Sequence, residues 1–119
     1  MIKRYLSRFT HALNGLKFAS LNDQGFRSQI YLGVLLLFIC LAFLLPLTGT
    51  EILFILGAYA LILITELQNS ALEIALDKIH PEHNDHIKKS KDMAAASVLV
   101  AGLFLLTVLI SLGLDRLFI

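Results

Sequence analysis

A chain of 119 residues with 57% hydrophobic and 16% charged residues has a mean hydropathy of +0.78. One domain over residues 1–119 fits this length, but a small water-soluble domain has too much surface for its volume to hide so many apolar side chains. The composition therefore indicates a membrane protein. The formal net charge of +1 argues against a nucleic-acid partner, because there is no basic excess for phosphate contacts. Cys40 stands alone in an apolar run, so no disulfide framework is expected.

The first segment, about residues 4–21, is predicted to form an amphipathic helix. Basic residues lie among apolar residues that recur near helical spacing. These apolar residues are Leu6, Phe9, Leu13, Leu16 and Phe18. A helix of this kind lies in the headgroup plane, with its basic groups toward lipid phosphates. A simple anchor that sets the topology would show the same periodicity, so both interpretations stay open. Residues 22–25 then break the pattern and bring Asp23 close to the membrane interface.

Three uncharged runs follow, at residues 30–47, 52–65 and 93–114. The first and third reach the length of a spanning helix, about 17–25 residues. The middle run is shorter and spans only if its helix continues past Glu66, which puts the acids of that helix at the membrane boundary. We therefore predict an all-α membrane protein with spans at about 29–47, 51–78 and 91–114. Pro46 and Gly49 are breaker residues that separate the first two spans.

The basic residues predict the orientation of these spans. Nine of the ten lysines and arginines precede the first span or lie between the second and third, and the exception is Arg116. Basic loops stay on the cytoplasmic side of a membrane. The N-terminus and the 78–91 segment are therefore expected in the cytoplasm, with the 46–51 loop and the C-terminus outside. No cleavable signal peptide is expected, because no apolar core precedes residue 30.

Four polar residues of the second span share one helical face, namely Glu66, Asn69, Glu73 and Asp77. A charge in the bilayer core costs at least about 2.5–3.5 kcal/mol, so these acids require a compensating role. Acids and lysines at a membrane face suit phosphoryl transfer, in which carboxylates bind Mg²⁺, lysine offsets phosphate charge and another carboxylate deprotonates the attacking hydroxyl. Pairing of these acids with lysines inside a helix bundle is the alternative. No glycine-rich phosphate-binding motif of either common type is present.

The stretch His80–His86 contains three histidines near acids. It has a proline and no regular ligand spacing, so a solvated loop is favoured over a structural zinc site. Lys91 follows it, at the start of the third span. Lysines there usually determine topology, and charge alone does not assign phosphate binding to Lys91.

The sequence Glu-Leu-Gln-Asn-Ser-Ala-Leu-Glu-Ile-Ala-Leu-Asp at 66–77, followed by Ser-Lys-Asp-Met-Ala-Ala-Ala at 90–96, resembles the prokaryotic diacylglycerol kinase family. The family pattern is Glu-x-x-Asn-(Ser/Thr)-Ala-(Ile/Leu)-Glu, then Asp, then Ala-Lys-Asp, and the resemblance covers essentially the whole chain. It implies an N-terminal surface helix plus three transmembrane helices in a homotrimeric bundle of the bacterial inner membrane. It also implies phosphorylation of a lipid hydroxyl by MgATP, with active sites between subunits.

The resemblance also implies roles for single residues. Glu66 matches the catalytic carboxylate that takes the proton from the lipid hydroxyl. Glu73 matches a metal-binding glutamate, and Asp23 stands where the family usually has its glutamate partner, one methylene longer. Asn69 and Asp77 match supporting residues. The residues that match nucleotide contacts are Arg4, His11, Glu82, His83, Asn84, Lys91 and Asp92, besides the two metal-binding acids.

The motif does not define which lipid is the substrate, because diacylglycerol kinases and undecaprenol kinases share the same motif. The short N-terminus and the Pro-Glu-His loop at 81–83 resemble the diacylglycerol branch, which is the substrate we expect. Undecaprenol is the alternative within the family. An alternative of another class is a non-enzymatic assembly subunit or ion-translocating subunit, whose function would not depend on ATP.

Overall fold

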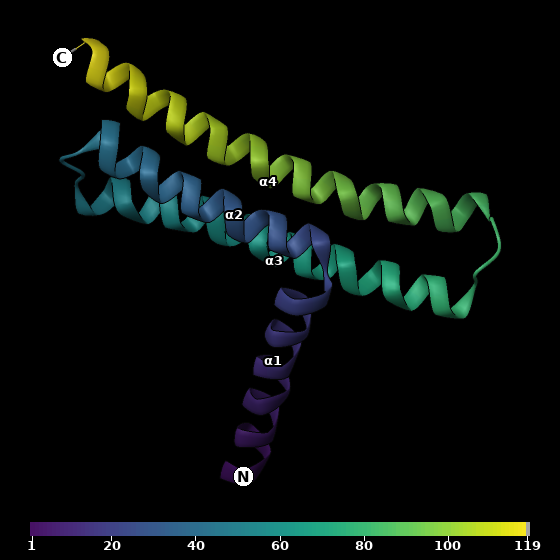
Figure 1. The fold of residues 1–119 in the computed structure, drawn as a ribbon. Helices are drawn as coiled ribbons and strands as arrows, with labels where there is room; N and C mark the ends of the chain where they lie inside the picture. The colour runs from purple at the N-terminus through teal and green to yellow at the C-terminus, as the bar shows by residue number, and fades with distance from the viewer. Residues whose placement is uncertain (119) are drawn as a thin grey trace.

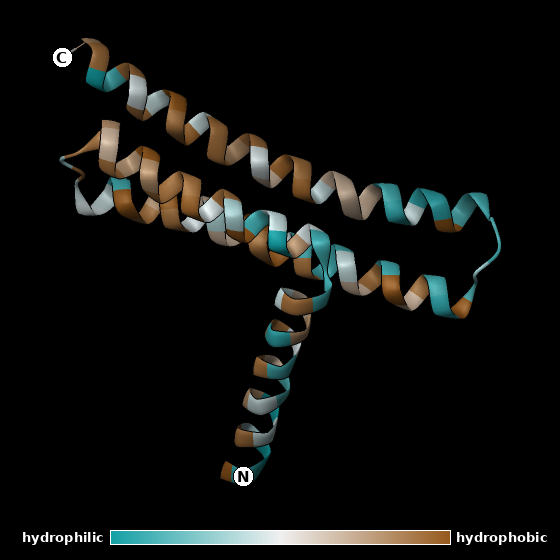
Figure 2. Ribbon diagram, viewed as in Figure 1, coloured by the Kyte–Doolittle hydropathy of each residue, from teal (hydrophilic) through white to brown (hydrophobic). Residues whose placement is uncertain are grey.

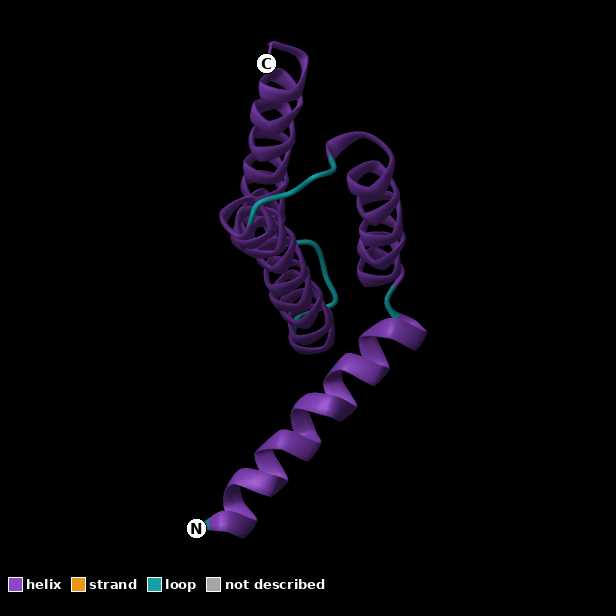
Figure 3. Cartoon of the chain, turned by 90° about the vertical axis from the view of Figure 1, so that its left-hand side faces the viewer, coloured by secondary structure: helices purple, strands orange, loops and turns teal. Residues whose placement is uncertain are grey.

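The computed structural model describes residues 1–118 and contains four α-helices in that range. They are α1 (Ile2–Asn22), α2 (Gln24–Ile39), α3 (Gly49–Ile79) and α4 (Asp85–Phe118), and a π-helical turn, η1 (Cys40–Leu44), continues α2. The helices α2, α3 and α4 lie side by side, while α1 projects away crosswise (Figure 1). Figure 3 shows the same chain from the side, as helices joined by short loops. The predicted all-α architecture is confirmed.

Three of these helices are long and apolar enough to cross a membrane, within residues 1–118: Gln24–Leu44, Gly49–Ile79 and Asp85–Phe118. α2 begins before the predicted start of the first span at about 29, and α4 begins before 91 and ends beyond 114. Both early starts have a capping residue. Asp23 accepts a hydrogen bond from the backbone N–H of Phe26, and Asn84 accepts from His86 and Ile87. A cap fixes a helix start wherever it lies, so the helices extend beyond the apolar runs.

The core is a stripe of apolar side chains along the three long helices. Ala58 on α3 is completely buried, Ile62 lies one turn further, and Ala101 on α4 is buried in the same cluster. Many other large apolar side chains face outward, and in Figure 2 hydrophobic colouring predominates along the long helices, while hydrophilic colouring gathers at the α3–α4 loop and where α2 begins. An outward apolar surface of this extent is suited to lipid rather than water.

Arg116 fastens the end of the bundle at which α2 meets α3. Its guanidinium pairs with Glu51 and donates to the carbonyl oxygens of Leu44 and Pro46, at 3.2 and 2.9 Å from Nη2. These carbonyls lie where the π turn ends, beyond regular helical bonding. The single basic residue outside the predicted cytoplasmic segments is thus paired with an acid and bound to backbone oxygens.

A second contact fixes α2 against α3 within the bundle. The phenol of Tyr59 donates to the backbone oxygen of Gln29 at 2.8 Å and lies directly over Gly33. Any side chain at position 33 would overlap the tyrosine ring, so glycine permits this close approach. Tyr59 lies two helical turns before Glu66 on α3, and the contact therefore sets how α2 and its first turn sit beside the acids.

Candidate active site

Asp23 occupies the one-residue break between α1 and α2, where the chain changes direction. Its Oδ2 accepts two hydrogen bonds, from the backbone N–H of Phe26 at 2.8 Å and from the hydroxyl of Ser70 at 2.7 Å. The first bond caps α2, and the second joins this junction to the middle of α3. A single chain therefore brings the acid of the N-terminal segment to the acids of the second span.

Glu66 is buried beside this junction, with 8% of its surface exposed. Its carboxylate rests against Gly25 in the first turn of α2, at a distance that a side chain at position 25 would not permit. Asp23 and Glu73 lie close enough to act electrostatically on Glu66. No hydrogen bond or cation satisfies the Glu66 carboxylate within residues 1–118. A buried acid without a partner is costly to the fold, so Glu66 requires a compensating role.

Asn69 adds a second buried polar side chain to the same region. It is 9% exposed, and its Oδ1 is buried without a hydrogen-bond partner in the described part of the chain. Together with Ser70 and Glu66, it makes up the buried polar residues of residues 1–118. These three lie within residues 66–70 of α3, so the buried polarity is concentrated at one place.

Glu73 lies one turn beyond Ser70 and is exposed. With Asp23 it supplies hard anionic oxygens from two elements that meet at this junction. Mg²⁺ is commonly bound by one or two carboxylates, with waters and substrate phosphates completing its octahedron. The donor set of Asp23 and Glu73 fits such an ion. A metal site formed by three or more acidic, histidine or cysteine side chains is not found in residues 1–118.

A cavity of about 520 Å³ lies between α1 and α3, next to this cluster. Its polar side chains are Asp23 and Ser70, and its remaining lining is apolar or glycine: Ala12, Gly15, Leu16, Phe18, Ala19, Leu67, Ala71 and Ile74. A pocket with an apolar body and a polar end is shaped for an amphipathic ligand. Nothing lies within 4 Å of where a side chain at Gly15 would begin, so the cavity is open there.

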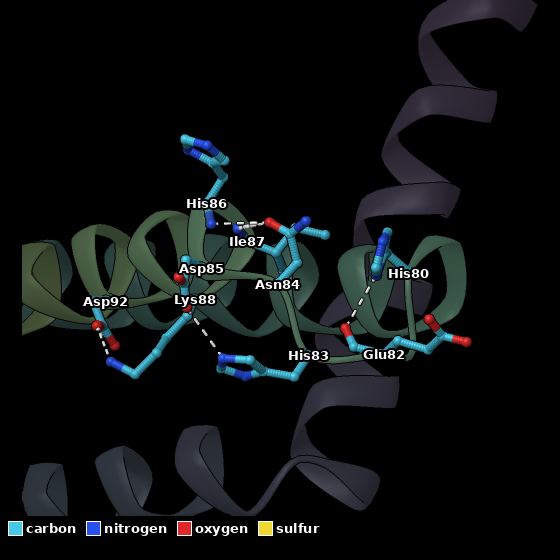
Figure 4. A network of polar contacts seen from close by, with 9 residues as sticks. All are labelled: His80, Glu82, His83, Asn84, Asp85, His86, Ile87, Lys88 and Asp92. Atoms are coloured by element: carbon cyan, nitrogen blue, oxygen red, sulfur yellow. Dashed lines mark hydrogen bonds and ion pairs between the residues drawn. The ribbon is translucent and has the colours of Figure 1, made fainter.

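Lysines and acids surround a second, polar cavity of about 330 Å³ at the α3–α4 loop. Lys91 on α4 forms an ion pair with Asp77 on α3. Lys88 pairs with Asp92 at 2.8 Å, as Figure 4 shows. Lys91 and Asp92 thus have different partners. Asp77 lies one turn beyond Glu73, so the acidic face of α3 leads from Glu66 to the ammonium group of Lys91.

The loop residues lie at this polar cavity, but some of their groups are already engaged. Asn84 uses its Oδ1 to cap α4, at 2.9 Å from the N–H of His86 (Figure 4). The exposed His83 ring lies 3.1 Å from Asp85, and the His80 ring lies 3.0 Å from the carbonyl oxygen of Glu82. The side-chain oxygen of Asn84 therefore serves as the N-cap of α4.

Arg4 and His11 are not brought to this cavity within one chain. Both lie on the exposed part of α1, which projects away from the bundle (Figure 1). The only side-chain hydrogen bond of His11 within residues 1–118 is to Ser7 on its own helix, at 3.3 Å. The predicted nucleotide contacts therefore fall into two groups that are separated in the single chain.

Sequence reasoning assigned no role to Gly25, Ser70 or Tyr59, which shape this site. Ser70 could have been found, because it lies on the same helical face as Glu66 and Glu73. Gly25 and Tyr59 act through contacts between helices, which no local pattern reveals.

The fold and the site define a small multi-pass membrane protein with a buried glutamate on α3, a largely apolar cavity beside α1 and a lysine-bearing polar cavity at the α3–α4 loop. The chain belongs to the prokaryotic diacylglycerol kinase family, a family of membrane lipid kinases, whose model matches residues 10–112. Proteins named diacylglycerol kinase are similar to it. The one from Haemophilus influenzae is 36% identical over 76% of this chain and 75% of its own. Those from Pseudomonas aeruginosa (36%; 84% and 80%) and Escherichia coli K12 (30%; 82% and 79%) are similar over comparable lengths.

Proposed function

We propose that this protein transfers the γ-phosphoryl group of ATP to the free hydroxyl of diacylglycerol, giving phosphatidic acid and ADP. The observation that carries the proposal is the buried, unpartnered carboxylate of Glu66 beside an apolar cavity whose polar end is Asp23 and Ser70. Two acyl chains and one hydroxyl suit an apolar cavity with one polar end. The relatives named diacylglycerol kinase support this substrate.

Glu66 is proposed as the general base. Its carboxylate takes the proton from the lipid hydroxyl as the oxygen bonds to the γ-phosphorus, and the bond between that phosphorus and the bridging oxygen of ADP breaks. A carboxylate with no hydrogen-bond donor of its own keeps its lone pairs available for the substrate proton. The buried Oδ1 of Asn69, which also lacks a partner, is proposed to assist at the same place.

Asp23 and Glu73 are proposed to hold Mg²⁺, which offsets the charge of the β- and γ-phosphates when bound. Lys91 is proposed to bind the phosphates from the polar cavity at the α3–α4 loop. Its ammonium group would leave Asp77 and pair with phosphate oxygens. Asp77 keeps that ammonium group in place before the nucleotide arrives. The exposed Glu82 and His83 beside this cavity are proposed to contact the remainder of the nucleotide, with Asp92 supporting them through Lys88.

The site is proposed to be completed in a homotrimer of the bacterial inner membrane. Support comes from the separation of Arg4 and His11 from the polar cavity within one chain, because α1 of a neighbouring copy could bring them there. The N-terminus and the α3–α4 loop are proposed to face the cytoplasm, where ATP is available. Their basic residues support that orientation.

The proposal is tested by lipid kinase assays on the purified full-length protein with radiolabelled ATP. Diacylglycerol and undecaprenol are offered separately in mixed micelles. We expect Mg²⁺-dependent label in phosphatidic acid, at a higher kcat/KM than for undecaprenol. A preference for undecaprenol would reassign the substrate within the family. Label in neither lipid would contradict the proposed kinase activity.

A further inference from the structure

We propose that Ser70 is a positioning residue, whose hydroxyl orients the Asp23 carboxylate for the metal ion. The proposal rests on the function proposed above, in which Asp23 is a ligand of Mg²⁺. It assigns to Ser70 a task that acts only through Asp23. The bond that carries it runs from Ser70 Oγ on α3 to Asp23 Oδ2 at the α1–α2 junction, over 2.7 Å.

The direction of this hydroxyl differs from that of six other serine and threonine hydroxyls within these helices. Side chains of serine and threonine inside a helix commonly donate to the carbonyl oxygen one turn earlier. In this chain Thr10, Ser20, Ser28, Thr65, Ser90 and Thr107 do so. Ser70 instead donates to a carboxylate 47 positions away in the sequence. Ser70 is buried, and within residues 1–118 its side-chain hydrogen bond is the one to Asp23.

The two donors to Asp23 converge on a single oxygen. Phe26 N–H and Ser70 Oγ both bind Oδ2, so Oδ1 is the oxygen that remains for a ligand. The terminal torsion of an aspartate is broad, and one donor leaves the plane of the carboxylate free to tilt. Donors from two different helices fix that plane. Aspartate has one torsion fewer than glutamate with which to adjust the position of its carboxylate. The orientation of the Asp23 carboxylate therefore matters more than that of a glutamate would.

The experiment compares Ser70→Ala, Ser70→Thr and the wild type as full-length proteins. One readout is the Mg²⁺ concentration that gives half-maximal kinase activity at saturating ATP. The other is independent of turnover: electron paramagnetic resonance counts Mn²⁺ bound with a non-hydrolysable ATP analogue. Loss of a group that orients a metal ligand typically weakens metal binding by about 10–100-fold, and we expect Ser70→Ala to fall in that range in both readouts. Ser70→Thr keeps the hydroxyl and should restore wild-type metal binding.

Two controls separate positioning from general packing. Ser97→Ala removes a hydroxyl that bonds only within α4, and should leave both readouts unchanged. In an Asp23→Asn background, Ser70→Ala should cause no further loss of metal binding, because the ligand it orients is already gone. If Ser70→Ala does not fold, Ser70→Cys, with its weaker donor, should give an intermediate affinity.

Each outcome decides a separate question. Normal metal binding in Ser70→Ala, together with weakened binding in Asp23→Asn, would overturn the positioning role alone. Normal metal binding in both variants would overturn the assignment of Asp23 as a ligand, and the role of Ser70 with it. Equal losses for Ser70→Ala and Ser70→Thr would show that packing, rather than the hydroxyl, determines the site.

Discussion

The carboxylate of Glu66 rests against Gly25, in the first turn of α2, where any side chain would overlap it. This contact places the proposed base, Glu66, against a residue that lies two positions after Asp23, the proposed metal ligand. It depends on the crossing of α2 and α3, which the Tyr59–Gln29 hydrogen bond and the Ser70–Asp23 bond fix on either side. The Glu66 carboxylate can occupy this position only because residue 25 is a glycine.

Gly25→Ala should lower kcat about 10-fold or more while the protein stays folded, because misplacing a reacting group by about 1 Å can cost 10²-fold. The new methyl group meets the end of a flexible glutamate side chain, which can rotate away, so stability should change little. Steady-state kinetics and thermal unfolding in detergent measure the two effects. Gly57→Ala, at a glycine with nothing within 4 Å, is the matched control and should change neither. A normal kcat in Gly25→Ala would show that the contact has no catalytic importance.

Asp23→Asn and Glu73→Gln should each raise the Mg²⁺ concentration required for half-maximal activity, because each replaces an anionic oxygen ligand by a neutral one. Asparagine caps a helix as well as aspartate does, so the start of α2 should be preserved in Asp23→Asn. A Mg²⁺ titration at saturating ATP measures the shift. If Asp23→Asn leaves the titration unmoved, Asp23 serves the fold only as the cap of α2.

Lys91→Met should raise the KM for ATP with a smaller change in the Mg²⁺ requirement, since an ammonium group acts on phosphate as a point charge. Lys91 is half-buried and paired with Asp77, so Asp77→Asn should produce a milder effect of the same kind. Lys89→Met is the matched control, because Lys89 is an exposed lysine of the same helix that does not line the polar cavity. Equal KM values for ATP in the wild type and Lys91→Met would remove Lys91 from the nucleotide site.

Gly15→Leu should raise the KM for long-chain diacylglycerol and leave short-chain substrates less affected, because leucine would project into the cavity between α1 and α3. The position is open and helical, so leucine also has a higher helix propensity there, and the protein should fold. The comparison uses diacylglycerols of different chain length. Gly57→Leu, on α3 away from this cavity, should leave the preference unchanged. An identical chain-length profile in Gly15→Leu would contradict the role of this cavity as the lipid site.

The sequence allowed the helical architecture to be predicted, because hydrophobic run length and breaker residues determine it locally. Residues 45–48, which include Pro46, separate the two helices in the structure, and the helix of the second span does continue past Glu66. The helices α2 and α4 begin before the predicted spans, whose limits in the membrane stay predictions. Asp23 and Asn84 cap those helices within polar segments, where an apolar run gives no signal.

The candidate site could be predicted only as a set of residues. The face shared by Glu66, Glu73 and Asp77 follows from helical periodicity, and the structure places Lys91 against it. The packing of α2 on α3 determines which of these groups are in contact. The contact between Glu66 and Gly25 could therefore not be predicted from the sequence. The roles of these residues remain predictions.

The most direct test of the account is the rate of phosphoryl transfer to diacylglycerol by Glu66→Gln beside the wild type. Glutamine keeps the shape of the side chain and removes the base, and a general base typically contributes about 10²–10⁴-fold. We predict a loss of kcat in that range, with folding and ATP binding retained, and with stability equal to or above that of the wild type because a buried acid has been neutralised. A Glu66→Gln protein with a near-normal kcat would contradict the central claim that Glu66 is the catalytic base.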